Sequence, residues 1–170
     1  AALVVVFDGH GGRKVAEWAS ELLPEHLLQN LRVDGWAEAL QRAFPTVDAE
    51  LRRRREALSA GRDASGSPVL ATLFDGKDTI HVASLGDCRA VLADSSRRGY
   101  ANCSSDCRAD RPDEIARVVG AGGFVANKRV NGQIAVSRAL GDFAFKGGND
   151  GDRVSCVPDV TTLKLRDGDD

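Results

Sequence analysis

The sequence lacks the features that would assign it to several specialised classes of protein. Its 170 residues include no methionine, and the longest apolar run, residues 1–7, is far shorter than the roughly 20 residues of a membrane-spanning helix. No basic segment precedes this run, as a secretory signal would require. The 23 basic and 25 acidic residues leave a formal net charge of −2, so there is no general attraction to nucleic acid or anionic membranes. We therefore expect no nucleic acid or membrane partner and an intracellular location, cytoplasmic or nuclear.

Cysteine is also sparse. The four residues, Cys88, Cys103, Cys107 and Cys156, match no common zinc-binding spacing and are too few for a disulfide-stabilised scaffold. The sequence therefore predicts reduced, partly buried thiols. Cys88 lies in a strand-like segment, where a cysteine is more often inert packing than a redox centre.

The remaining composition is that of an ordinary globular protein, with 42% hydrophobic residues, 18 glycines and 5 prolines. A chain of this length can bury one sizeable core, so we expect residues 1–170 to form one domain or part of one. The chain begins directly in a strand-like run and ends on Asp169 and Asp170, just after another. Because cutting at a core strand leaves unpaired edges, these are poor places for a domain to begin and end.

The first third of the chain predicts a strand followed by two helices. Residues 1–7 are apolar at both odd and even positions, which is typical of a strand buried on both faces. A helical period begins near Lys14, with Pro24 expected to end or kink the helix. A second helix is predicted from Trp36 to Leu51, interrupted by Pro45. The four arginines that follow favour the solvated end of this helix over a nucleic-acid patch.

The rest of the chain favours antiparallel strands. A hairpin is predicted with a turn at residues 75–78, and Asn131-Gly132 is typical of a tight type I′ turn. The expected strands are 68–74, 79–85, 88–93, 100–103 and 160–165. A helix is expected from Asp113 to Ala121, a helical turn at 137–140 and a polar loop at 147–153. Strands in hairpins with helices inserted in blocks indicate an α+β fold.

The most informative segment for function is DGHGG, residues 8–12, at the end of the first predicted strand. Asp8 offers a carboxylate, and Gly9 an unhindered carbonyl, of the kind that Mg²⁺ or Mn²⁺ prefers. His10, two residues on, could donate a proton near a metal-bound substrate. An alternative of about equal weight is a glycine-rich turn in which Asp8 caps the next helix. No Gly-Lys-Ser/Thr follows, which excludes a P-loop.

A second carboxylate follows the strand at residues 79–85. Asp87 stands after Gly86 between two predicted hairpin strands, where a Gly-Asp pair by itself indicates only a turn. His26 and His81 have no carboxylate or cysteine neighbours in the sequence, so neither is assigned to catalysis.

Four blocks of the sequence resemble, in the same order, the signature blocks of the metal-dependent protein phosphatase family, the protein phosphatase 2C type. The blocks are VFDGHGG (6–12), ASLGDCRAVL (83–92), RVNGQIAVSRALGD (129–142) and VPDV (157–160), and Asp106 and residues 112–123 also resemble the family's segment before its flap. The resemblance implies a central antiparallel β-sandwich flanked by helices. It also implies a phosphatase that hydrolyses phosphoserine and phosphothreonine in protein substrates.

The resemblance further implies roles for individual residues. Asp8 would bridge two Mg²⁺ or Mn²⁺ ions, the Gly9 carbonyl would bind one of them, and Asp87 would serve a third, weaker metal position. His10 would protonate the leaving serine or threonine oxygen. In this chemistry the ions lower the pKa of a shared water, and the resulting hydroxide attacks phosphorus in line.

The sequence also departs from the family pattern. The remaining metal ligands and the phosphate-binding arginine of the family are expected outside this chain, and Asp169 and Asp170 are not expected to replace them. Pro68 stands where the family usually has a small hydroxylated residue, and Cys-Arg-Ala (107–109) where it has His-Lys-Pro. Arg138 and Asp142 could face the substrate, but structural hydrogen bonds and ion pairs that hold the flap region are the favoured interpretation.

The resemblance therefore predicts a metal-dependent protein serine/threonine phosphatase of which this chain is the central part. Residues 1–170 would form a single, incomplete domain that is truncated at both ends, with little activity from these residues alone. The alternative is a non-catalytic, phosphatase-like domain that binds partners. It is disfavoured because Asp8, His10 and Asp87 are all retained.

Overall fold

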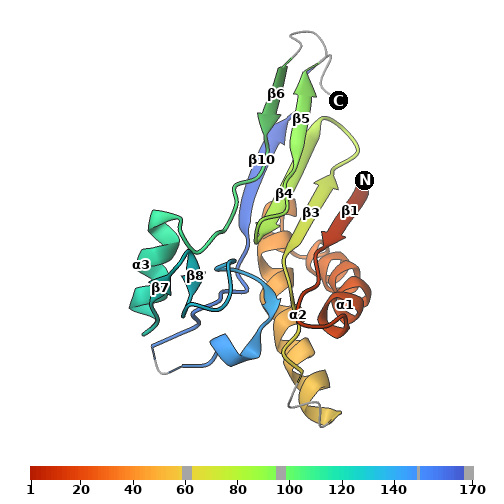
Figure 1. Cartoon of the computed structure of the whole chain (residues 1–170). Helices are drawn as coiled ribbons and strands as arrows, with labels where there is room; N and C mark the ends of the chain where they lie inside the picture. The colour runs from red at the N-terminus through yellow and green to blue at the C-terminus, as the bar shows by residue number, and fades with distance from the viewer. Residues whose placement is uncertain (59–62, 95–98, 149, 167–170) are drawn as a thin grey trace.

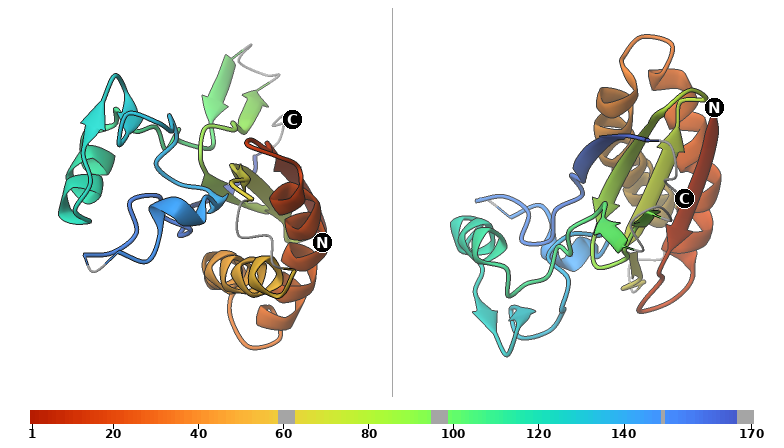
Figure 2. Two further views of the ribbon diagram at one scale, coloured as in Figure 1. Left: turned by 60° about the horizontal axis from the view of Figure 1, so that its bottom comes forward. Right: turned by 90° about the horizontal axis from the view of Figure 1, so that it is seen from above.

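The computed structural model describes residues 1–58, 63–94, 99–148 and 150–166. Two long helices cover one face of a four-stranded sheet, and a smaller group of elements around α3 (Pro112–Gly120) lies to one side of that sheet (Figures 1 and 2). The combination of helices and antiparallel strands confirms the predicted α+β class.

The central sheet is antiparallel throughout. Its order is β1 (Ala2–Phe7), β3 (Val69–Phe74), β4 (Thr79–Leu85) and β10 (Asp159–Lys164). The predicted β3–β4 hairpin is confirmed, and Asp75 begins its turn by accepting hydrogen bonds from the N–H groups of Lys77 and Thr79. Because β1 and β4 both run antiparallel to β3, their carboxyl ends lie at the same edge of the sheet.

The prediction that the first strand is buried on both faces is wrong. Leu3, Val5 and Phe7 pack against the helices, but Val4 and Val6 are 65% and 49% exposed. The reason is that β1 is an edge strand, and the helices cover only one face of the sheet. Cys88, Leu92 and Cys103 cover part of the other face, over β3 and β4, where they pack with Leu70 and Val82.

Helices α1 (Lys14–Asn30) and α2 (Trp36–Ala57) both continue through their prolines. Pro24 therefore does not end the first helix, and the predicted interruption of the second at Pro45 is wrong. A proline inside a helix loses one backbone hydrogen bond and crowds the preceding turn. Packing compensates, because the core includes residues on both sides of each proline. These are Leu22, Leu23 and Leu27 in α1 and Ala43, Phe44 and Val47 in α2.

The arginine run ends α2, as predicted. Arg53 pairs with Glu50 of the same helix, and Arg54 reaches Glu21 on α1. The guanidinium groups of Arg52 and Arg55 lie over the ring of Phe143, at 4.6 and 5.6 Å from its centroid. The run thus joins the helix to a segment near the end of the chain.

Short paired strands complete the structure. They are β2 (Gly66–Ser67) with β9 (Leu140–Gly141), β5 (Val91–Asp94) with β6 (Gly99–Asn102), and β7 (Val125–Ala126) with β8 (Arg129–Val130). Because β5 pairs with β6 and not with β4, Gly86 and Asp87 do not form a hairpin turn. A 3₁₀ turn, η1 (Phe143–Phe145), follows β9.

Two turn predictions had different outcomes. Asn131 and Gly132 both have left-handed φ angles, 50° and 69°, as a type I′ turn requires. The helical turn predicted at residues 137–140 is wrong, because this segment is extended and bonded to other parts of the chain. The N–H of Ser137 donates to Cys107, and that of Ala139 donates to Ser155.

The four cysteines are free thiols, as predicted. In the described residues, no helix combines the length and the apolar character needed to cross a membrane. Asp169 and Asp170 lie outside the described residues.

Candidate functional site

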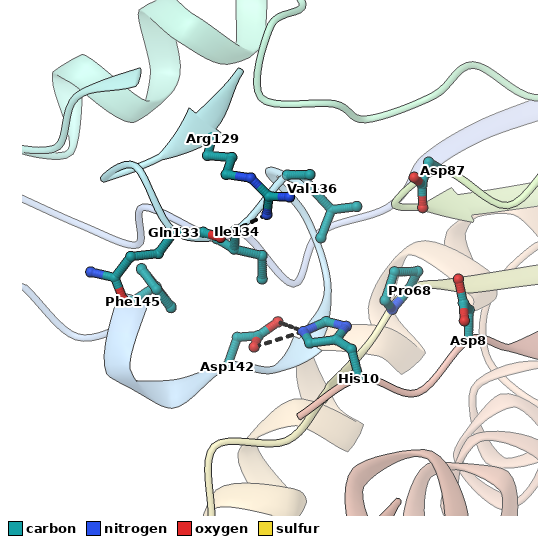
Figure 3. Close-up of a pocket in the computed structure, with 11 residues that line it drawn as sticks. Asp8, His10, Pro68, Asp87, Arg129, Gln133, Ile134, Val136, Asp142 and Phe145 are labelled. Atoms are coloured by element: carbon teal, nitrogen blue, oxygen red, sulfur yellow. Dashed lines mark hydrogen bonds and ion pairs between the residues drawn. The ribbon is translucent and has the colours of Figure 1, made fainter. Parts of the chain in front are cut away.

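A pocket of about 420 Å³ lies between the edge of the central sheet and the smaller group of elements (Figure 3). The sheet side contributes Asp8, His10, Pro68 and Asp87. The other wall comes from the residues after β7 and from η1, namely Arg129, Gln133, Ile134, Ala135, Val136, Asp142 and Phe145. The pocket therefore combines three carboxylates, an imidazole and a guanidinium with several apolar side chains.

The order of the strands explains why Asp8 and Asp87 meet. Each follows a strand, β1 and β4 respectively, and these strands end at the same edge of the sheet. The chain after β1 is fixed further by backbone bonds, since the N–H of Asp8 donates to Pro68 and that of His10 to Gly66. The structure thus brings the predicted residues Asp8, His10 and Asp87 to one pocket, with Gly9 between the first two. Their chemical roles remain predictions.

His10 is held by a residue that was not predicted to belong to the site. Its Nε2 lies 2.9 Å from both carboxylate oxygens of Asp142, which is only 4% exposed. Asp142 was expected to form a structural pair within the flap. The two residues are 132 positions apart in the sequence, so their contact had no local signal. The sequence block that ends in Asp142 resembles the family, but nothing in the sequence showed that the Asp142 carboxylate contacts His10.

The Asp142 carboxylate raises the pKa of His10 above its ordinary value of 6.5, mainly through this hydrogen bond. Partial burial of the ring acts in the opposite direction, and the negative charges of Asp142, Asp8 and Asp87 add to the increase. The shift stabilises the imidazolium form of His10 relative to that of a free imidazole, with Nε2–H donating to Asp142.

Gly66 makes the contact between His10 and Asp142 possible. His10 pairs with Gly66 on one side, and Gly141 pairs with Gly66 on the other. A β carbon added at Gly66 would collide with the Asp142 carboxylate. The carboxylate therefore occupies the space that any side chain at this position would fill.

The donors at the pocket suit a hard divalent cation but form only part of a coordination sphere. Asp8 is exposed, and Asp87 is 31% exposed with the Arg108 guanidinium 3.9 Å away. Within the described ranges, no group of three or more His, Cys, Asp or Glu side chains is arranged to hold a metal. The carboxylates of Asp8 and Asp87 and the Gly9 carbonyl are oxygen donors of the type that Mg²⁺ and Mn²⁺ take.

Comparison with known proteins decides the family. The family model described as protein phosphatase 2C matches residues 1–170. The chain belongs to the protein phosphatase 2C family. It is 38% identical over 178 residues to the mouse "Probable protein phosphatase 1N" and 36% identical over 171 residues to the fission yeast "Protein phosphatase 2C homolog 3". These matches cover 99% and 97% of this chain but 42% and 40% of the relatives, so the chain spans about two fifths of their length.

Solved structures agree with the fold of this protein phosphatase 2C chain. A crystal structure of a phosphatase from Toxoplasma gondii matches 98% of the chain and 60% of its own length, with a TM-score of 0.77 and 26% identity. A Caenorhabditis elegans sex-determining protein matches with a TM-score of 0.85 at 24% identity, over 98% of this chain and 41% of that one. The predicted family and fold class are therefore confirmed.

Arg138 of this protein phosphatase 2C chain has a structural role, as expected. It binds Glu114 at 2.7 Å and Asp159 at 2.6 Å and lies outside the pocket. His81 likewise lies away from the pocket, where it stacks on Trp36 and bonds to Thr162.

Two departures from the protein phosphatase 2C pattern have clear positions. Pro68 lines the pocket and packs against Gly86, where an added β carbon would lie 2.6 Å from the proline ring. Cys107 is buried, and its N–H donates to the Gly86 carbonyl next to Asp87.

Burial raises the pKa of the Cys88 thiol to about 11, and the negative charges of Asp8 and Asp87 add to this increase. The raised pKa disfavours a reactive thiolate at Cys88.

Proposed function

We propose that this chain is the central part of a metal-dependent protein phosphatase that hydrolyses phosphoserine and phosphothreonine. The observation that carries the proposal is the meeting of Asp8, His10 and Asp87 at one pocket in a chain of the protein phosphatase 2C family. The names of relatives, such as "Protein phosphatase 2C homolog 3", support the same activity.

In this proposal the oxygen donors of the pocket hold Mg²⁺ or Mn²⁺. Asp8 would contribute its carboxylate to two ions, Gly9 its carbonyl, and Asp87 its carboxylate to a third position. When bound, the ions lower the pKa of water and neutralise charge on the phosphoryl group. Ligands beyond these three residues are needed for tight binding, because no larger cluster occurs in the part of the chain that the structure describes.

His10 would act on the leaving group. Its Nε2 is engaged by Asp142, which leaves Nδ1 to carry the proton that the departing serine or threonine oxygen takes up. Because Asp142 fixes the orientation of the imidazole, the ring would already be positioned for this proton transfer when the substrate binds. Ile134 and Val136, on the opposite wall, would limit the access of water to the bound phosphoester.

The proposal is tested by manganese-dependent hydrolysis of a phosphothreonine peptide. We would compare this chain with a version extended at both ends to the length of its relatives. We expect hydrolysis by the extended protein, its loss in Asp8→Asn, and little activity from these 170 residues. Asp34→Asn, which removes an acidic residue paired with Arg42 outside the pocket, is the matched control and should keep full activity.

Two results would contradict the proposal. A folded extended protein that binds phosphopeptide but shows no metal-dependent turnover would support the alternative of a non-catalytic binding domain. Full activity in Asp8→Asn would show that Asp8 is not a metal ligand.

A further inference from the structure

A fully buried ion pair adjoins the segment that carries Asp142. The Nζ of Lys146 lies 2.8 Å from Oδ1 of Asp48 on α2, and the two side chains are 0% and 7% exposed. The core residues Phe44, Val47 and Leu51 belong to the same helix as Asp48. Burying two charges is expensive in free energy, and such a pair is a weak source of net stability. We therefore ask which part of the structure the Asp48–Lys146 pair positions.

The hydrogen bonds of the pair go to the backbone on both sides of Asp142. Oδ1 of Asp48 also accepts the N–H of Gly141 at 2.8 Å, and Nζ of Lys146 donates to the carbonyl of Ala139 at 2.9 Å. The chain is thus fixed just before Asp142, by Ala139 and Gly141, and again after it, at Lys146.

The backbone of Asp142 needs this support. Its φ and ψ angles are 48° and 40°, in the left-handed region, where the backbone of a non-glycine residue is strained. A strained residue persists only where its surroundings determine its conformation. Here the Asp142 N–H donates to Ser65, and its carbonyl accepts from Phe145. In this conformation the carboxylate passes over Gly66 and reaches Nε2 of His10.

We propose that Asp48 and Lys146 are positioning residues for His10. The buried pair fixes the β9–η1 turn, the turn holds the Asp142 carboxylate over Gly66, and the carboxylate orients the imidazole with Nε2 away from the phosphoester. The catalytic consequence rests on the proposed function. The orientation of the imidazole does not.

The test is NMR of the ring nitrogens of His10 in the full chain. The wild type should show an Nε2–H proton that is bonded to a carboxylate and exchanges slowly, and Asp142→Ala should lose it. In Asp48→Ala/Lys146→Met both charges are removed together, so no unpaired charge is left buried. We expect this double variant to unfold cooperatively but to lose the Nε2–H signal, as Asp142→Ala does.

The matched control is Glu50→Gln/Arg53→Met, which removes a more exposed ion pair two residues further along the same helix, with Arg53 69% and Glu50 29% exposed. It should keep the wild-type signal. If the buried double variant does not fold, Asp48→Asn provides the milder change, because it removes the charge that holds Nζ of Lys146 and keeps the size of the side chain. The Nε2–H signal should again be lost. An unchanged His10 signal in either folded variant overturns the proposal.

These measurements need neither metal nor substrate, so they stand apart from the proposed function. If the extended protein is active, the folded variant should lower kcat by about 10- to 100-fold, because small misplacement of a catalytic group has effects of this size. Its KM should stay near the wild-type value. Equal losses in the buried and exposed double variants would also overturn the positioning role.

Discussion

Glu114 offers the sharpest quantitative prediction of the structure. Its side chain is 1% exposed on α3, and its two oxygens accept hydrogen bonds from Arg138 at 2.7 Å and Arg117 at 2.9 Å. Burial alone would raise the pKa of this carboxyl, but the hydrogen bonds from the two arginines outweigh burial and lower it from 4.5 to about 2. A change from 4.5 to about 2 corresponds to about 3 kcal/mol in the free energy of unfolding.

The direction of the pH dependence follows from the lowered value. The contribution is fully present above the unfolded pKa of 4.5 and disappears as the pH falls through the folded pKa of about 2. Glu114→Gln should therefore lower the free energy of unfolding by about 3 kcal/mol at pH 7 and by less than half of that at pH 3. Urea denaturation of the two proteins at both pH values measures the difference.

Asp113→Asn is the matched control, because Asp113 precedes Glu114 in the sequence and pairs with Arg111, but its side chain is 61% exposed. Exposed pairs contribute less than about 1 kcal/mol, so this variant should lose little. A Glu114→Gln deficit that is as large at pH 3 as at pH 7 would refute the assignment of the stability to the ionised carboxylate.

The other predictions concern the core, the thiols and the site. Phe44→Ala, at a residue that is 0% exposed, should lower the free energy of unfolding by about 3–5 kcal/mol, whereas Val33→Ala, at 83% exposure, should leave it nearly unchanged; both are measured by urea denaturation. Cys88 should react slowly with a disulfide reagent at pH 7 and quickly once the chain is unfolded, since its pKa is about 11, and fast labelling of the folded chain would contradict this. Gly66→Ala should lower the kcat of the extended protein at least about 10-fold with a smaller change in KM, in steady-state kinetics, because the added methyl displaces the Asp142 carboxylate.

The sequence was sufficient where the determining interactions are local. The β3–β4 hairpin, the turn at Asn131 and the helix α3 follow from residues that are neighbours in the chain. The resemblance of four blocks then indicated the family and the grouping of Asp8 with Asp87. The structure supplies the physical reason for this grouping, because β1 and β4 run in the same direction in the sheet.

The errors arose where distant contacts decide the outcome. Pro24 and Pro45 were expected to interrupt helices that tertiary packing keeps continuous. The exposure of Val4 depends on the position of β1 at the edge of the sheet, which no local pattern specifies. The extended course of residues 137–140 depends on partners such as Cys107 and Ser155 elsewhere in the chain.

Gly66 has a consequence for how this region is best studied by mutagenesis. An alanine scan detects residues by the atoms that it removes, and Gly66 contributes no side-chain atom to the contact between His10 and Asp142. Its importance becomes visible only when atoms are added. In a saturation library every substitution at this position should be damaging whatever its polarity or charge, whereas tolerance at Asp142 should depend on whether the new side chain can accept a hydrogen bond. The two positions would thus carry different mutational signatures although they serve the same contact.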